Sequence, residues 1–125
     1  QLERKDSMGF TALMFVSTWG HVSIISCLIE NRADIEAQDD QGYSSLMRSP
    51  ISNRTDAVLK LLHLGGDINA RDQQGKNALM VLLDWDFEMP EMIKLLIQKG
   101  SDMEAVSNRG ETVMDIARRN GRVHL

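Results

Sequence analysis

Two stretches of the chain, thirty-three residues apart, carry nearly the same sequence. Ala33–Met47 reads ADIEAQDDQGYSSLM, and Gly66–Met80 reads GDINARDQQGKNALM. A match this dense at a fixed period is the signature of a repeat protein, in which each unit buries its apolar face against its neighbours. At this spacing the two stretches share eight identical pairs: Asp34/Asp67, Ile35/Ile68, Ala37/Ala70, Asp39/Asp72, Gln41/Gln74, Gly42/Gly75, Leu46/Leu79 and Met47/Met80.

The repeated unit follows the pattern Asp-x-x-Gly-x-(Thr, Ser or Asn)-x-Leu. The pattern starts at Asp6, Asp39 and Asp72, and returns in part from Ser107, where serine replaces the aspartate. In both period and pattern the chain resembles the ankyrin repeat family, whose unit is a β-turn followed by two helices. The resemblance implies an all-α solenoid of helix–turn–helix repeats joined by β-hairpin turns.

The spacing also predicts where each repeat begins and ends. Residues 1–5 are expected to be the tail of a preceding repeat, so that the chain is part of a longer protein. Residues 107–125 are expected to be a partial or C-terminal capping repeat, since Arg118 and Arg119 stand where an internal repeat would be packed. The predicted full repeats are three, the last with a two-residue insertion between Asp84 and Pro90: residues 6–38, 39–71 and 72–106.

Three local features test this alignment. Thr11 is placed to cap a first helix over Ala12–Thr18 with its hydroxyl. Arg32 stands where this family usually has glycine, so Asn31 or Arg32 must adopt a left-handed backbone conformation to end the second helix. Pro50 lies inside the expected helix Ser45–Ser52, where it removes a backbone donor, and it predicts a shortened or distorted helix.

Composition limits the classes of partner and of cellular setting. The net charge of −4 gives no basic surface for nucleic acid, so a nucleic-acid partner is not expected. The single cysteine, Cys27, excludes an internal disulfide framework and favours an intracellular location, cytoplasmic or nuclear. No apolar run approaches the length of about 18 residues that spans a bilayer, so membrane insertion is not expected. We expect a monomer.

No arrangement of residues typical of catalysis or metal binding stands out. The sequence has no phosphate-binding glycine loop, nucleophile elbow or paired-carboxylate motif, so we expect no enzyme activity and no cofactor. His21 and Cys27 lie off a common helical face, and no metal site is predicted. The position that holds histidine in the family's Thr-Pro-Leu-His motif holds methionine in three repeats, and these side chains are predicted to fill the core: Met14, Met47 and Met80.

The aromatic side chains give the functional prediction. All six fall on the hairpins, on the first helix of a repeat or on the loop after it, and these parts line the concave surface of such a solenoid. Phe10 and Phe15 are expected to pack between repeats, and Trp19, Tyr43 and Trp85 are weighed evenly between packing and binding. The predicted partner-binding residues are Trp19, Tyr43, Arg48, Trp85, Phe15, Asp40, Lys76 and Phe87, with Asp84 and Glu88 as charges at the rim.

The resemblance implies a non-catalytic module that binds a partner protein or peptide on its concave face. Three alternatives remain open at this point. The chain is a regulatory or targeting domain of a larger enzyme whose catalytic part lies elsewhere, or a small enzyme on this scaffold, or a spacer that binds nothing. A spacer would show no exposed aromatic cluster, and an enzyme would need a nucleophile with a base beside it.

Overall fold

The computed structural model describes residues 4–85 and 88–120. Within these residues the chain is all-helical and has no β-strand, which confirms the predicted fold class. The helices are short and come in pairs, the last of them unpaired within the described part: α1 (Ala12–Thr18), α2 (Val22–Glu30), α3 (Ser45–Ile51), α4 (Thr55–His63), α5 (Ala78–Asp84), α6 (Pro90–Gln98) and α7 (Val113–Arg119).

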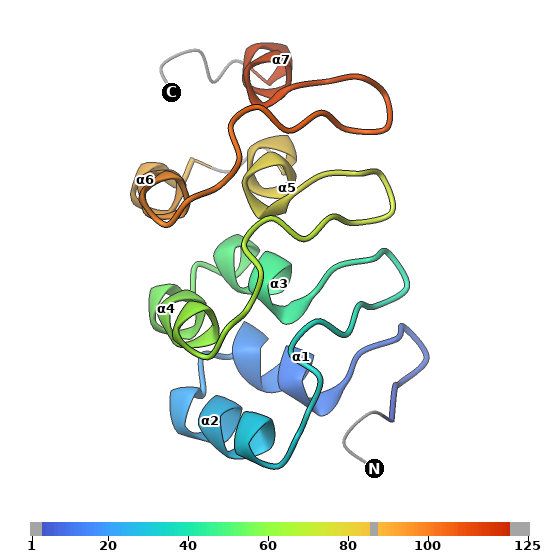
Figure 1. The fold of residues 1–125 in the computed structure, drawn as a ribbon, viewed down its shortest axis with the longest axis vertical. Helices are drawn as coiled ribbons and strands as arrows, with labels where there is room; N and C mark the ends of the chain where they lie inside the picture. Colours follow the sequence, from blue (N-terminus) through green and yellow to red (C-terminus); the bar gives the residue numbers. More distant parts are fainter. Residues whose placement is uncertain (1–3, 86–87, 121–125) are drawn as a thin grey trace.

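The helices form two layers, with a hairpin loop projecting before each inner helix (Figure 1). The inner helices α1, α3, α5 and α7 pack one on the next, and α2, α4 and α6 each pack outside the inner helix that precedes them. The loops after α2 and α4 lead into the next hairpin. This is the arrangement expected for a solenoid, and we propose that each hairpin with the helices after it is one repeat within the limits predicted above.

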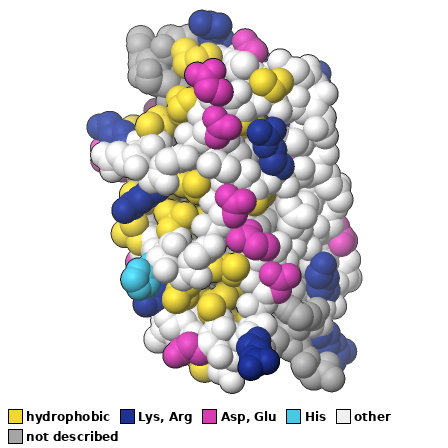
Figure 2. Space-filling model, viewed as in Figure 1, with side chains coloured by type: hydrophobic (Ala, Val, Ile, Leu, Met, Phe, Trp, Pro, Cys, Tyr) yellow, Lys and Arg dark blue, Asp and Glu magenta, His cyan; other side chains and the backbone are white. Residues whose placement is uncertain are grey.

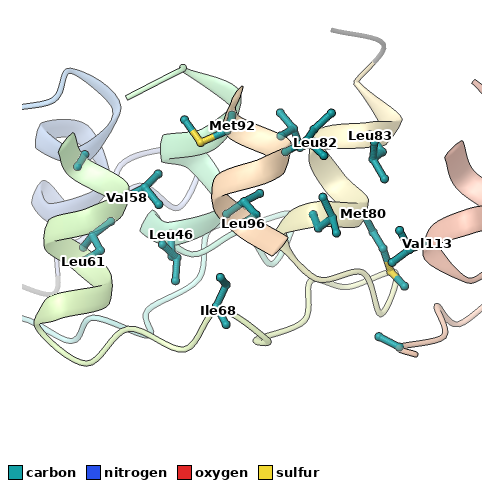
Figure 3. Packing of buried hydrophobic residues seen from close by; sticks show 14 of the residues in the cluster. Leu46, Val58, Leu61, Ile68, Met80, Leu82, Leu83, Met92, Leu96 and Val113 are labelled. Atoms are coloured by element: carbon teal, nitrogen blue, oxygen red, sulfur yellow. The ribbon is translucent and has the colours of Figure 1, made fainter. Parts of the chain in front are cut away.

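The core lies between the two layers and continues from one pair of helices to the next. Every residue of α5 from Ala78 to Leu83 is buried, because α3 covers one side of this helix and α7 the other. Figure 3 shows Val58 of α4, Leu82 of α5 and Leu96 of α6 in the same cluster. The three methionines predicted to fill the core are fully buried, which confirms that prediction: Met14, Met47 and Met80.

The ends of the helices follow the sequence closely. The hydroxyl of Thr11 accepts a hydrogen bond from the backbone N–H of Met14, which confirms the predicted cap of α1. Arg32 has a φ of 73°, so this non-glycine residue does end α2 in the left-handed region. Asn53 also has a positive φ, 56°, at the position that Gly20 occupies one repeat earlier.

The prediction for Pro50 was wrong in one respect. Helix α3 has seven residues, as many as α1 and α5, so it is not shortened. The physical reason is position: Pro50 lies in the last turn of a short helix, where its ring deprives only the carbonyl of Leu46 of a donor. Helix α5 ends at Asp84 and α6 begins at Pro90, and we propose that the insertion of the third repeat lies between them.

Candidate functional site

The hairpins form the part of the candidate surface that the inner helices do not cover. The carboxylate of Asp39 accepts hydrogen bonds from the backbone N–H groups of Gln41 and Tyr43, at 2.9 and 3.0 Å. Asp6 and Asp72 do the same in their own hairpins, and Ser107 does so with its hydroxyl. One acidic or hydroxyl side chain therefore fixes each hairpin through hydrogen bonds to its own following backbone.

Neighbouring hairpins also touch one another. The backbone N–H of Gln73 donates to the carbonyl of Gln41 at 3.3 Å, and that of Asn108 donates to Gln74 at 2.8 Å. Gly42 and Gly75 have positive φ, and a Cβ atom on either would lie within 3 Å of the next hairpin. Glycine is needed at this position for two reasons, the positive φ of the backbone and the close approach of the next hairpin.

A cluster of aromatic rings around Arg48 lies where the first two hairpins meet. The rings of Phe10 and Phe15 pack edge to face with centroids 5.3 Å apart. The guanidinium of Arg48 lies 4.4 Å from the centroid of Phe10 and 5.1 Å from that of Tyr43, distances typical of a cation–π contact. Asp39 accepts two hydrogen bonds from this guanidinium, one of them 2.9 Å long from Nε.

The pairing of Arg48 with Asp39 decides what this cluster offers to a partner. The carboxylate of Asp39 is almost fully buried, with 1% of its side chain exposed, whereas 18% of the Arg48 side chain is exposed. The charge of Arg48 is therefore balanced by a buried carboxylate, and the outer side of the cluster is formed by aromatic rings. Phe15, 45% exposed, is the most open of them.

A pocket lies next to this cluster, between the second and third hairpins. Its volume is about 150 Å³, and it is open to solvent on one side. Tyr43, on the hairpin before α3, and Trp85, at the end of α5, belong to both the lining and the predicted set. The residues that line the pocket are Tyr43, Gln74, Lys76, Val81, Asp84 and Trp85.

Charged side chains at one wall of the pocket form a continuous chain of ion pairs. The ammonium group of Lys76 pairs with Asp84, whose other carboxylate oxygen lies 3.1 Å from Nη2 of Arg119 on α7. Arg119 in turn pairs with Glu111 at 3.1 Å. Two cations and two carboxylates alternate along this chain, so its formal charge is zero.

The titration of Asp84 reflects these contacts. Burial raises the pKa of this carboxyl, but hydrogen bonds from Lys76 and Asn120 and the charges of Lys76 and Arg119 outweigh burial. The net result is a pKa below the ordinary value for aspartate. Asp84 is therefore ionised at neutral pH and fully occupied by its partners, which is the state of a structural carboxylate rather than of a general acid or base.

The family model for ankyrin repeats, in three copies, matches residues 1–72, which is more than half of the sequence. The chain belongs to the ankyrin repeat family. No curated protein matches the chain. Ankyrin repeats are generally protein–protein interaction modules, and the family is generally non-catalytic.

The ankyrin architecture continues past the matched residues. The hairpin at Asp72, the pair α5 and α6, and the final helix α7 repeat the earlier geometry, including the capping of α5 by Asn77 and of α7 by Thr112. Five of the six residues that line the pocket, and the ion pairs beside it, lie past residue 72, whereas Tyr43 lies within the matched residues.

The structure brings together most of the predicted surface residues, but not all of them. Arg48 and Phe15 belong to the cluster, Lys76 and Trp85 line the pocket, and Tyr43 belongs to both. Phe10 packs beneath the arginine of the next ankyrin repeat, which confirms that it packs between repeats.

Two predicted residues lie apart from the cluster and the pocket, and a third is not among the described residues. Trp19 is 61% exposed at the end of α1 and belongs to neither the cluster nor the lining of the pocket. Asp40 is exposed at the tip of a hairpin, where its backbone N–H donates to the carbonyl of Met8. Phe87 lies outside the described residues.

Two pocket residues, Gln74 and Val81, were not predicted from the sequence, and Asp84 was predicted as a charge at the rim. Val81 occupies the same repeat position as Phe15 and Arg48, so the thirty-three-residue spacing could have identified it. Asp84 lies at the wall of the pocket, where Lys76, buried beside it, holds its carboxylate. Glu88, the other rim charge, is exposed after Trp85.

Acidic side chains, and not aromatic rings, characterise the loops that follow the outer helices. These loops carry exposed acidic residues in successive ankyrin repeats, and Figure 2 shows acidic side chains in a column along one face. Burial is the main cause that raises the pKa of Glu36, and the charges of Asp67 and Asp34 raise it further. The backbone N–H of Asp67 donates to Glu36 at 2.9 Å and opposes this shift.

Among residues 4–85 and 88–120, no three His, Cys, Asp or Glu side chains gather closely enough to hold a metal ion. None of the helices in this same part of the chain is long and apolar enough to cross a bilayer.

Proposed function

We propose that this ankyrin array binds a partner protein or peptide on the concave surface formed by its hairpins and inner helices, and that it does so without catalysis. The observation that carries the proposal is the continuity between the aromatic cluster and the pocket. Tyr43 contacts Arg48 on one side and lines the pocket on the other. Exposed aromatic side chains around a pocket are typical of the centre of a protein interface.

The charged groups on this surface support binding rather than catalysis. Arg48 pairs with Asp39, and Lys76 pairs with Asp84, so the charged groups beside the pocket have ionic partners already. A general base or nucleophile needs a side chain that is poised to react and held by a second group. Apart from these ion pairs, the surface offers aromatic rings and the side-chain amide of Gln74, which suit the contacts of an interface.

A quantitative pull-down tests this proposal. The wild-type chain and its Tyr43→Ala and Trp85→Ala variants are immobilised in equal amounts of folded protein and exposed to a lysate of the source cell. Leu59→Ala is the matched control, because Leu59 on the outer helix α4 is 40% exposed and Trp85 is 41% exposed. We expect the wild type and Leu59→Ala to retain the same proteins, and we expect both aromatic variants to lose them.

Two results would contradict the proposal. If the same proteins bind to all four forms, the partner surface lies away from the pocket. If Leu59→Ala alone loses them, the outer helices form the binding face instead. In either case the cluster and the pocket would have only a structural role.

A further inference from the structure

We propose that the pocket between Tyr43 and Trp85 receives one large uncharged side chain of the partner, aromatic or long aliphatic, which anchors an extended peptide segment. This inference rests on the proposed function and names the chemistry of the group that is recognised. It follows from the size of the pocket, the pairing of its charges and the nature of its walls.

The size of the pocket favours a single side chain. At about 150 Å³ it is smaller than the roughly 300–1,000 Å³ of sites that enclose a small molecule or cofactor. It is also open on one side, so a side chain can enter while its own backbone stays outside. One large residue of a peptide meets both conditions.

The charges around the pocket select against an ion. A cationic anchor would have to displace Lys76 or Arg119 from Asp84, and Tyr43 already has the guanidinium of Arg48 beside it. An anionic anchor would have to displace Asp84 from Lys76. Displacing Lys76 from Asp84 would leave its ammonium group, with 9% of the side chain exposed, buried without an ionic partner, which costs far more than an uncharged contact. An anion at Lys76 would break the same ion pair.

The walls of the pocket combine three polar or charged side chains with two aromatic rings and one aliphatic side chain, and the rings offer contact to a large uncharged group. Trp85 and Tyr43 present rings that lose little conformational freedom on binding, and Val81 lies buried at the base with 1% exposure. Gln74 is exposed, and its side-chain amide carries donors and an acceptor that can pair with the backbone of a bound peptide. This arrangement matches a peptide whose anchor side chain is aromatic or long aliphatic and whose backbone groups on either side hydrogen-bond to the side-chain amide of Gln74.

The test is selection from a random linear peptide library displayed on phage, with the complete chain as bait. Each selected peptide is then synthesised and titrated against the wild type and the variants Trp85→Ala, Tyr43→Ala and Leu59→Ala. We expect the peptides to share one aromatic or long aliphatic residue whose replacement by alanine weakens binding at least about 30-fold. Trp85→Ala and Tyr43→Ala weaken binding comparably, and Leu59→Ala leaves it unchanged.

A second variant tests the argument from charge. Lys76→Met leaves Asp84 with fewer cations, so the pocket becomes net negative and the same selection is expected to favour lysine or arginine as the shared residue. Thermal melting shows whether this variant is folded. If it is not, Lys76→Gln, which keeps a hydrogen-bond donor beside Asp84, takes its place with the same expectation.

The outcomes separate this inference from the proposed function. Peptides that depend on Trp85 but share an acidic or basic anchor in the wild type overturn the inference and leave binding on the concave surface intact. Peptides that bind all variants equally overturn both. A library that yields no enriched sequence overturns the peptide anchor, while the pull-down still decides the proposed function on its own.

Discussion

The side-chain amide of Gln38 donates a hydrogen bond of 2.8 Å to the backbone carbonyl of Arg71, thirty-three residues further along the chain. One repeat later, the guanidinium of Arg71 donates at 2.8 Å to the carbonyl of Val106. Each of the two side chains also donates to the glycine carbonyl of its own hairpin, Gly42 or Gly75. Glutamine and arginine therefore perform the same task, joining one hairpin to the next.

The first prediction concerns this connection between hairpins. Arg71→Ala removes both hydrogen bonds and is expected to lower the free energy of unfolding by about 1 kcal/mol, because these contacts are partly exposed to water. Arg71→Gln is the matched control, since Gln38 makes the same two bonds one repeat earlier. Urea unfolding measures both. A glutamine variant as unstable as the alanine variant would show that the charge of Arg71, rather than its hydrogen bonds, is what matters.

The second prediction concerns the strained end of α2. Arg32 has a φ of 73°, whereas the same position in the next two repeats is glycine, Gly65 and Gly100. Arg32→Gly is expected to stabilise the chain by about 1 kcal/mol, because a side chain in the left-handed region costs roughly 1–2 kcal/mol. Arg32→Ala keeps the Cβ atom and should bring no such gain in urea unfolding. An equal gain from both variants would place the effect in the arginine side chain and not in the backbone.

The third prediction concerns the proline of α3. Pro50→Ala restores a donor for the carbonyl of Leu46 and introduces a good helix former, at the cost of a small cavity where the buried ring was. We expect the free energy of unfolding to rise by about 1 kcal/mol, because the helical penalty of proline exceeds the loss of packing. Differential scanning calorimetry is the measurement. A lower melting midpoint would mean that the buried ring contributes more through packing than it costs in the helix.

The fourth prediction is the pH dependence of Asp84. The folded state lowers the pKa of this carboxyl, so the ionised form stabilises the fold above its ordinary pKa, and this contribution disappears as the pH falls through the lowered value. Asp84→Asn should therefore unfold more easily at neutral pH, by about 1 kcal/mol, and approach the wild type in acid. Denaturant midpoints across the acidic range test this.

Glu36 provides the internal contrast for that measurement. Its pKa is raised in the folded state, so the ionised carboxylate weakens the fold, and the penalty grows as the pH rises through the raised value. Glu36→Gln should be neutral in acid and slightly stabilising at neutral pH. Parallel pH profiles for the two variants would contradict the assignment of opposite signs.

The thirty-three-residue period was sufficient to predict the architecture, because hairpins and helix ends depend on short-range features. Asp6 fixes its hairpin through its own following backbone, and Thr11 caps the helix that begins one residue later. A left-handed residue at Asn31 or Arg32 could be predicted because the family usually has glycine at the position of Arg32, and the structure shows that it is Arg32. These local rules act within a few residues, so one sequence suffices to apply them.

The pocket could be predicted only in part. Tyr43, Lys76 and Trp85 were identified because aromatic and basic residues gather on hairpins and at the ends of inner helices. The ion pairs that decide its chemistry join Asp84 to residues eight positions earlier and thirty-five positions later, Lys76 and Arg119. Such pairings depend on how side chains meet across repeats, and the period locates only the backbone. Trp19, which shares its repeat position with Trp85, lies outside the pocket, which is lined by residues of the next two repeats.

The most direct test of the central claim is a paired measurement on the partner recovered in the pull-down. Trp19, Tyr43 and Trp85 are each replaced by alanine, and the melting midpoint and the affinity per folded molecule are measured for every variant, with Leu59→Ala as control. We expect Tyr43→Ala and Trp85→Ala to weaken binding by about 2 kcal/mol or more at a nearly unchanged midpoint. Lowered midpoints with intact affinity would contradict the account, because the aromatic residues would then only hold the repeats together.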